Sequence, residues 1–227
     1  MLRVGLTGGL GSGKTTAARL FAALGANVLQ SDAIGRELME PGQVVYAAIA
    51  AHFGDGVVLA DGRLDRGKLA RIAFADGRVE ELNAIVHPAV IEREAELSEE
   101  IRARDARAVV MVESALIFET KYGSETKYGS SSGAVGAGWQ NRFDRIVLVT
   151  APEEVKIARF VARSAVGETL SEERRAELEE EARRRIAQQI PDEQKSALCD
   201  YVLTNGGALT ELEWQVDQLW QILRAAA

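Results

Sequence analysis

The amino-acid sequence predicts an α/β fold in which a five-stranded parallel sheet is flanked by helices. Short apolar segments recur along the chain, and stretches with helical periodicity separate them. Strands that alternate with helices imply a mostly parallel sheet covered on both faces, because each crossover helix packs back onto the sheet. The strands are expected at residues 3–6, 26–29, 108–112, 145–149 and 201–204.

The expected helices follow from apolar spacing and from residues that start or stop a helix. The first, over residues 15–24, ends at Gly25, and a shorter one over 32–39 ends before Pro41. Ser171 precedes two glutamates and predicts the N-cap of a charged helix that stops before Pro191. The last helix carries apolar residues at helical spacing, namely Leu212, Val216, Leu219 and Leu223.

Two helical stretches interrupt the expected core. Residues 41–105 have helical periodicity, breaks at Gly54, Gly62 and Pro88, and no strong strand, which predicts an inserted helical domain for the substrate. Residues 153–189 are expected to form a helical lid. The nucleotide-binding core would then consist of residues 1–40, 106–152 and 190–227.

Composition and charge limit the function classes. The formal net charge of −7 argues against a nucleic-acid partner held by bulk electrostatics. No run of about 18 apolar residues is present, so no membrane span is expected. The first residues lack the features of a signal peptide, which favours a cytoplasmic protein. Cys199 is the single cysteine, so it cannot form an intramolecular disulfide and is expected to be structural. The sequence does not indicate an oligomeric state.

A six-residue repeat stands apart from this pattern. The sequence E-T-K-Y-G-S at residues 119–124 recurs at 125–130, and a Ser/Gly-rich tract continues to Gly138. Two copies of six residues are too few for a solenoid, and the composition predicts a flexible surface loop within 119–142. The alternative is a lid or interface element near the site.

Residues 8–15, G-G-L-G-S-G-K-T, match the phosphate-loop pattern G-x-x-x-x-G-K-[ST] at every fixed position. An apolar strand precedes the motif and an amphipathic helix follows it, as in P-loop NTPases. The glycines allow backbone N–H groups to turn toward phosphate oxygens, and the helix N-terminus favours negative charge. The Lys14 ammonium suits the β- and γ-phosphates, and the Thr15 hydroxyl suits Mg²⁺. The expected nucleotide-binding residues are Gly8, Gly9, Gly11, Ser12, Gly13, Lys14, Thr15 and Thr16.

The phosphate loop alone does not distinguish a kinase from an ATPase or a GTPase. Asp32 is the candidate residue that would indicate a kinase. It follows the second expected strand, and ligands collect beyond the carboxyl ends of parallel strands. A carboxylate at this place could accept the proton of an attacking hydroxyl. The alternative is a helix N-cap.

Further segments occur in a fixed order after the phosphate loop. They are D-A-I-G-R-E-L at 32–38, L-D-R at 64–66, L-N-A-I-V-H-P at 82–88, L-I-F-E at 116–119, R-I-A-Q-Q at 185–189, Lys195, and D-Y-V-L-T-N at 200–205. In type and order this set resembles the dephospho-CoA kinases over nearly the whole chain, except for an insertion at 120–142. These kinases transfer the γ-phosphoryl group of ATP to the ribose 3′-hydroxyl of dephospho-CoA, which completes coenzyme A.

The resemblance implies roles for single residues, with ATP as donor, Mg²⁺ as cofactor and dephospho-CoA as acceptor. Asp32 would receive or orient the acceptor proton, and Lys14 would neutralise charge on the transferred group. Glu113 would help to position Mg²⁺, directly or through water, together with Thr15. Further implied contacts are Arg36, Arg66 and His87 with the acceptor, Arg163 with the triphosphate as a lid arginine, and Asn205 near the adenine.

The chain departs from the family pattern at two places, and other functions remain open. Gln30 occupies a position that is often a second Asp, and E-S-A-L-I-F-E at 113–119 lacks the proline of the family's D-x-P-L-L-F-E. Taken alone, His87 is more typical of a packed or capping residue, and Arg36 and Arg66 are either surface charges or the local positive groups that an anionic substrate requires. The alternatives are another small-molecule or nucleotide kinase with the same core, and a nucleotide-dependent switch or binding module. A switch or binding module would not explain why Asp32 occurs together with an enclosed helical domain.

Overall fold

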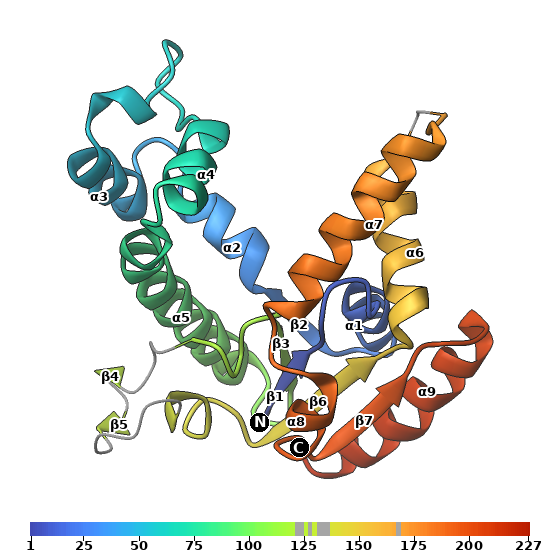
Figure 1. Ribbon diagram of the computed structural model, residues 1–227. Helices are drawn as coiled ribbons and strands as arrows, with labels where there is room; N and C mark the ends of the chain where they lie inside the picture. Colours follow the sequence, from blue (N-terminus) through green and yellow to red (C-terminus); the bar gives the residue numbers. More distant parts are fainter. Residues whose placement is uncertain (121–124, 127–128, 131–136, 167–168) are drawn as a thin grey trace.

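A five-stranded parallel sheet forms the centre of the molecule, as Figure 1 shows. The computed structural model describes residues 1–120, 125–126, 129–130, 137–166 and 169–227. The strand order is β2-β3-β1-β6-β7, and every pair is parallel, which confirms the predicted fold class. The strands are β1 (Leu2–Thr7), β2 (Asn27–Gln30), β3 (Val109–Glu113), β6 (Arg145–Thr150) and β7 (Tyr201–Thr204).

The register of the sheet brings polar residues to one edge. Glu113, the last residue of β3, lies opposite Leu6 of β1 and opposite Gln30 of β2. β1 therefore ends beside this carboxylate just before the glycine-rich loop begins. Since the carboxyl ends of parallel strands meet at the same edge, residues from distant parts of the sequence converge there.

Helices cover both faces of the sheet. On one face α1 (Lys14–Ala23) and α9 (Leu209–Ala225) pack against β1, β3 and β6. On the other face Gly5 leaves no room for a side chain, because an added Cβ would lie 2.8 Å from Ile146 Cδ1 and 2.9 Å from Ile117 Cδ1. This close packing of apolar side chains fixes the strands that carry the loop.

Two helical arms rise from the sheet and diverge (Figure 1). One arm has α2 (Ser31–Leu38), α3 (Val44–Phe53), the 3-10 turn η1 (Asp55–Val57), α4 (Arg66–Ala75) and the first part of α5 (Val79–Arg104); the other has α6 (Glu153–Ser164) and α7 (Glu172–Ala187). Each arm buries its own apolar cluster, around Ile49 in the first and around Phe160 in the second. Ser171 caps α7 by accepting a hydrogen bond from the backbone N–H of Arg174 at 3.2 Å, as the sequence predicted.

The expected break at Pro88 is wrong, because α5 continues through this residue from Val79 to Arg104. A proline inside a helix removes one backbone hydrogen bond and crowds the preceding turn. Here α5 packs against α2, and its last turns pack against β3 through Ile101. Burial along the length of the helix outweighs the lost hydrogen bond.

Smaller elements complete the chain. The short helix α8 (Asp192–Ser196) follows Pro191 and was not expected from the sequence, and the 3-10 turn η2 (Ala137–Trp139) precedes β6. In the predicted loop over 119–142, β4 (Glu125–Thr126) and β5 (Gly129–Ser130) pair in antiparallel fashion. The rest of the repeat, at 121–124, 127–128 and 131–136, lies outside the described residues. Within the described part of the chain, no helix combines the length and apolar character that a membrane crossing requires.

Candidate active site

The glycine-rich loop between β1 and α1 is tightly curled against its neighbours. Gly11 and Gly13 have positive φ angles of 72° and 90°, which side-chain-bearing residues rarely adopt. A Cβ on Gly11 would lie 2.3 Å from the carbonyl oxygen of Lys156, and one on Gly8 would lie 2.5 Å from Ser12 Oγ. Glycine at these positions therefore allows the curled backbone and its close packing, as the phosphate-loop motif predicts.

Asn205 and Arg159 hold the outer side of this loop. Asn205 follows β7, is 6% exposed, and donates from Nδ2 to the carbonyl oxygen of Ser12 at 2.8 Å. Arg159 of α6 donates to Asn205 Oδ1 at 3.2 Å and approaches the carbonyl oxygens of Gly11 and Ser12 at 3.4 Å. The structure places the Asn205 side chain against the loop backbone, and its expected place near the adenine stays a prediction.

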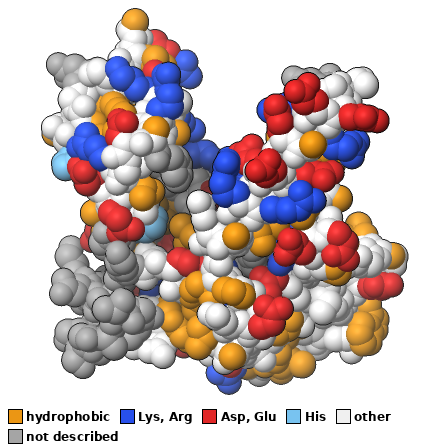
Figure 2. Space-filling model, in the orientation of Figure 1, with side chains coloured by type: hydrophobic (Ala, Val, Ile, Leu, Met, Phe, Trp, Pro, Cys, Tyr) orange, Lys and Arg blue, Asp and Glu red, His pale blue; other side chains and the backbone are white. Residues whose placement is uncertain are grey.

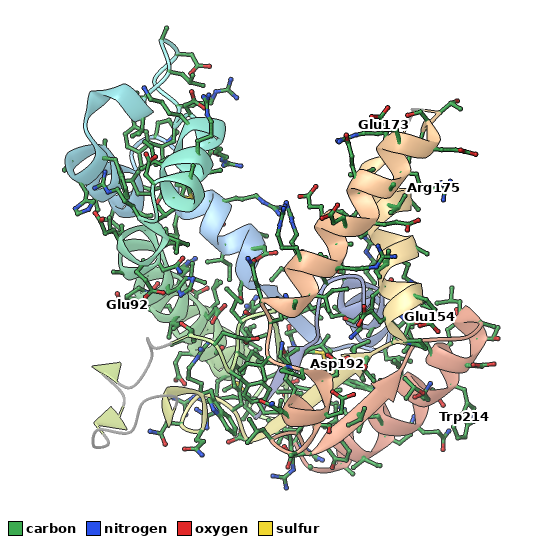
Figure 3. The ribbon with its side chains drawn as sticks, viewed as in Figure 1. Glu92, Glu154, Glu173, Arg175, Asp192 and Trp214 are labelled. Atoms are coloured by element: carbon green, nitrogen blue, oxygen red, sulfur yellow. The ribbon has the colours of Figure 1, made fainter. Side chains whose placement is uncertain are left out.

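A second group of residues, on α6, on α8 and between α7 and α8, lies beside the loop. The backbone N–H of Leu10 donates to Gln189 Oε1 at 2.9 Å. Below it, Asp192 accepts short hydrogen bonds from Thr150 Oγ1 and Lys156 Nζ. Figure 3 labels Asp192 near the sheet, at the foot of the arm. These residues carry no local sequence signal except Lys156, which interrupts the apolar face of an amphipathic helix.

Lys14 begins α1 and is half-buried among charged groups. Burial lowers the pKa of the Lys14 ammonium, whereas the negative charges of Glu113 and Asp32 raise it and the positive charges of Arg163 and Lys195 lower it. The structure therefore brings Lys14, Asp32, Glu113 and Arg163 close enough to interact electrostatically. Arg163 itself is exposed in the last turn of α6.

Thr15 and Glu113 form a hydrogen-bonded pair across the end of the sheet. The Thr15 hydroxyl donates to Glu113 Oε1 at 2.7 Å, and the Gln30 amide donates to Glu113 Oε2 at 2.8 Å. Gln30 therefore orients the Glu113 carboxylate. Thr16 lies half-buried in the same first turn of α1.

Asp32 lies in the first turn of α2, at the wall of a cavity of about 280 Å³. The helix is preceded by Gln30 as its N-cap residue, with no side-chain capping bond, so the alternative reading of Asp32 as the N-cap is wrong. Its exposed carboxylate makes no hydrogen bond or ion pair to the described residues. The cavity is lined by Ser31, Asp32, Gly35, Arg36, Met39, Val86, His87, Val90, Ile91, Glu94, Ser114, Leu116, Thr120 and Arg142.

The structure brings two of the three other predicted acceptor contacts into this cavity. Arg36 and His87 line it, and His87 Nδ1 lies 3.1 Å from Thr120 Oγ1. Burial lowers the pKa of His87, which favours the neutral imidazole. Arg66 does not line this cavity: it pairs with Glu40 at 2.9 Å beside a neighbouring cavity of about 270 Å³.

Besides the pair of Lys156 and Asp192, two more buried ion pairs close to the site were not found from the sequence. Arg142 donates to Glu94 at 2.8 Å at the cavity wall, and Lys195 of α8 lies 2.8 Å from Glu119. The two residues of each pair lie far apart in the chain and on different elements, so no local sequence pattern predicts the pairs.

Burial raises the pKa of Cys199 to about 12, which keeps this thiol protonated and agrees with a structural role.

The space-filling view shows a hollow between the two arms (Figure 2). Lys and Arg side chains are exposed on both sides of the hollow, although the whole chain carries a net charge of −7. This local distribution favours an anionic ligand on an acidic protein. No cluster of three or more His, Cys, Asp or Glu residues suited to a metal is present among the described residues.

A sequence profile of the family described as dephospho-CoA kinase matches residues 2–128 and 134–211. The chain belongs to the dephospho-CoA kinase family. The internal stretch outside the match, residues 129–133, is narrower than the expected insertion at 120–142, so most of the repeat lies inside the family match.

Relatives of this family match along the full length of the chain. The chain is 36% identical to a dephospho-CoA kinase of Thermobifida fusca over 99% of its length and 97% of the relative. It is 38% identical to that of Corynebacterium jeikeium over 97% of its length and 98% of the relative. Among solved structures, a protein from Thermus thermophilus is 31% identical, with a TM-score of 0.70 over 98% of this chain and 97% of that chain.

Proposed function

We propose that this dephospho-CoA kinase family member transfers the γ-phosphoryl group of ATP to the ribose 3′-hydroxyl of dephospho-CoA and thereby produces coenzyme A. Family membership supports the reaction and ATP as the donor. The observation that supports the roles of single residues is the place of Asp32, on a cavity wall and within electrostatic reach of Lys14. In this proposal the acceptor occupies the cavity beside Asp32, and the loop that carries Lys14 binds the triphosphate.

The phosphate loop would hold the donor. Its inward N–H groups and the start of α1 would bind the β- and γ-phosphates. The proposed donor contacts are Gly8, Gly9, Gly11, Ser12, Gly13, Lys14, Thr15 and Thr16, with Arg163 of α6 reaching the triphosphate when the arm over residues 153–189 closes as a lid. Asn205 would act by keeping the loop curled, since it bonds to the backbone of Ser12.

The acceptor would enter the cavity beside Asp32, held by the arm that residues 41–105 build. Arg36 and His87 would contact it directly. Arg66 would bind a more distant part of the acceptor, because it lines the adjoining cavity and the two cavities share Met39. The aliphatic side chains that line the cavity suit the purine or the alkyl chain of the acceptor. The arginines suit the diphosphate of the acceptor.

In the transfer itself, Asp32 would take the proton of the 3′-hydroxyl as that oxygen forms a bond to the γ-phosphorus. The bond from the γ-phosphorus to the bridging oxygen breaks, and ADP leaves with the electron pair. The Lys14 ammonium would neutralise negative charge that develops on the phosphoryl oxygens. Closure of the two arms would exclude water, which would otherwise compete with the acceptor.

Thr15 and Glu113 fit a magnesium ion that is bound together with the nucleotide. A hydroxyl and a carboxylate oxygen 2.7 Å apart are ligands of the kind that Mg²⁺ prefers, and one or two protein groups suffice when phosphates supply the rest. Bound Mg²⁺ supplies positive charge to the β- and γ-phosphates. Gln30 would keep the Glu113 carboxylate turned toward Thr15, either for direct ligation or for contact through water.

The test is an ADP-release assay with purified protein, MgATP and dephospho-CoA, compared with nucleoside monophosphates and small alcohols as acceptors. Asp32→Asn is expected to retain ATP binding and to lower turnover by about 10²–10⁴, the range for a lost general base. Wild-type turnover in this variant would refute the role of Asp32. Absence of transfer to dephospho-CoA by the folded wild-type protein would refute the proposed reaction.

A further inference from the structure

A buried hydrogen-bonded chain connects the residue next to Asp32 with two other elements. Ser31, the first residue of α2, donates from Oγ to Glu94 Oε1 at 2.5 Å. The other carboxylate oxygen of Glu94 accepts from Arg142 at 2.8 Å. Glu94 is 4% exposed and lies on α5, whereas Arg142 precedes β6, so the three residues join an arm to the sheet.

This cluster is costly to build for stability alone. Burial raises the pKa of Glu94 and lowers that of Arg142, which shows that desolvation opposes both charges, while their mutual attraction offsets it. Buried ion pairs add little net stability compared with apolar residues of the same size. All three residues also line the cavity that contains Asp32. The cluster therefore points to a role in the geometry of the cavity.

We propose that Ser31, Glu94 and Arg142 form a positioning unit that fixes the first turn of α2 and thereby aims the Asp32 carboxylate at the acceptor hydroxyl. This inference rests on the proposed function of Asp32 as the base. Asp32 follows Ser31 directly and makes no hydrogen bond of its own to the described residues, so its direction depends on the backbone of that turn. Glu94 fixes this turn by accepting the hydrogen bond from Ser31, and Arg142 fixes the Glu94 carboxylate by donating to it.

Packing along the two helices gives the unit its stiffness. α2 and α5 are in contact, and Gly35 lies against Val90, where an added Cβ would lie 3.5 Å from Val90 Cγ2. This contact fixes the separation of the helices in the second turn of α2, and in the proposal the bond of Ser31 opposes rotation of α2 about its axis at its first turn. The hydrogen bond from Ser31 to Glu94 lies at the end of α2 that carries the base, where such a rotation would displace the carboxylate.

The test is placed at Ser31, since replacing Glu94 would leave a buried guanidinium without its counter-charge. Ser31→Ala removes the connection and leaves the pair of Glu94 and Arg142 intact. We expect kcat to fall about tenfold, the equivalent of one hydrogen bond to a charged group, with KM for ATP and for dephospho-CoA unchanged. Ser31→Thr keeps a hydroxyl and should restore most of the lost kcat.

Ser98→Ala is the matched control. Ser98 is buried on α5 and donates to the backbone carbonyl oxygen of Glu94 at 2.6 Å, so the variant removes a hydroxyl near Glu94 without touching its carboxylate. Its kcat is expected to equal that of the wild type. An equal loss of kcat in the variants of Ser98 and Ser31 would refute positioning through the carboxylate, as would full activity of Ser31→Ala.

A double variant separates this inference from the proposed function. In an Asp32→Asn background, Ser31→Ala should cause no further loss, because the residue that it aims is already disabled. A further tenfold loss would show that Ser31 acts independently of Asp32 and would overturn the proposal. If Asp32→Asn alone keeps wild-type turnover, the proposed base is wrong, which is a separate outcome that also removes the basis of this inference.

Discussion

The loop glycines provide a prediction whose magnitude follows from the structure. Gly13→Ala adds a methyl group at a φ of 90°, and a left-handed backbone costs a residue with a side chain about 1–2 kcal/mol. The added Cβ would also lie 2.0 Å from Asn205 Nδ2, so the amide must move and lose its 2.8 Å hydrogen bond to Ser12. Leaving that carbonyl with only the 3.4 Å approach of Arg159 costs about 1–3 kcal/mol more. The expected total is about 2–5 kcal/mol.

Gly42→Ala is the matched control for this prediction. Gly42 has a φ of 89°, and an added Cβ would meet nothing within 4 Å. Only the backbone cost of about 1–2 kcal/mol remains. The difference between the two variants therefore isolates the collision with Asn205.

Urea unfolding of both variants and the wild type measures this difference. With a slope of about 2 kcal/mol per molar urea, the midpoint of Gly13→Ala should lie about 0.5–1.5 M below that of Gly42→Ala. Binding of a non-hydrolysable ATP analogue should be lost only in the Gly13 variant. Equal midpoints would show that the loop accommodates a Cβ and that Asn205 does not hold it, which would refute the reasoning.

Two further predictions concern charged groups. Lys14→Met should lower transfer by at least about 10²-fold and leave the unfolding midpoint unchanged or higher, because burial already opposes this charge; a lower midpoint would contradict that account. Glu81 is half-exposed, and hydrogen bonds from Arg78 and His52 lower its pKa from 4.5 to about 2. Its ionised form therefore contributes stability above pH 4.5 that is lost as the pH falls through about 2. The gap in melting temperature between the wild type and Glu81→Gln should close over that window, and a constant gap would exclude this linkage.

The fold could be predicted largely because its signals are local. Strand and helix periods and the caps at Gly25 and Ser171 are readable from short windows, and the observed elements match them. Prediction failed at Pro88, where the intrinsic preference of one residue was overridden by packing along α5. It also missed α8, whose five residues are too few to show a period.

The site could be predicted only in part, for the same reason. The conformation of the loop from Gly8 to Thr15 can be predicted from the sequence, because consecutive residues form it. By contrast, the pairing of Thr15 with Glu113 joins residues 98 positions apart, and nothing in either segment specifies that distance. Arg66 was assigned from order in the sequence and lies beside a different cavity from Asp32.

By itself, the sequence determined the parallel α/β core and the phosphate loop, because their signals lie in short stretches of the chain, whereas Asp32 became the candidate base only through the resemblance to the family. Only the tertiary structure decided which distant groups surround them: Asn205 behind the loop, Gln30 on Glu113, and the buried unit of Ser31, Glu94 and Arg142. Such pairs form when packed helices and strands bring side chains within about 3 Å, where desolvation makes each hydrogen bond strongly dependent on position.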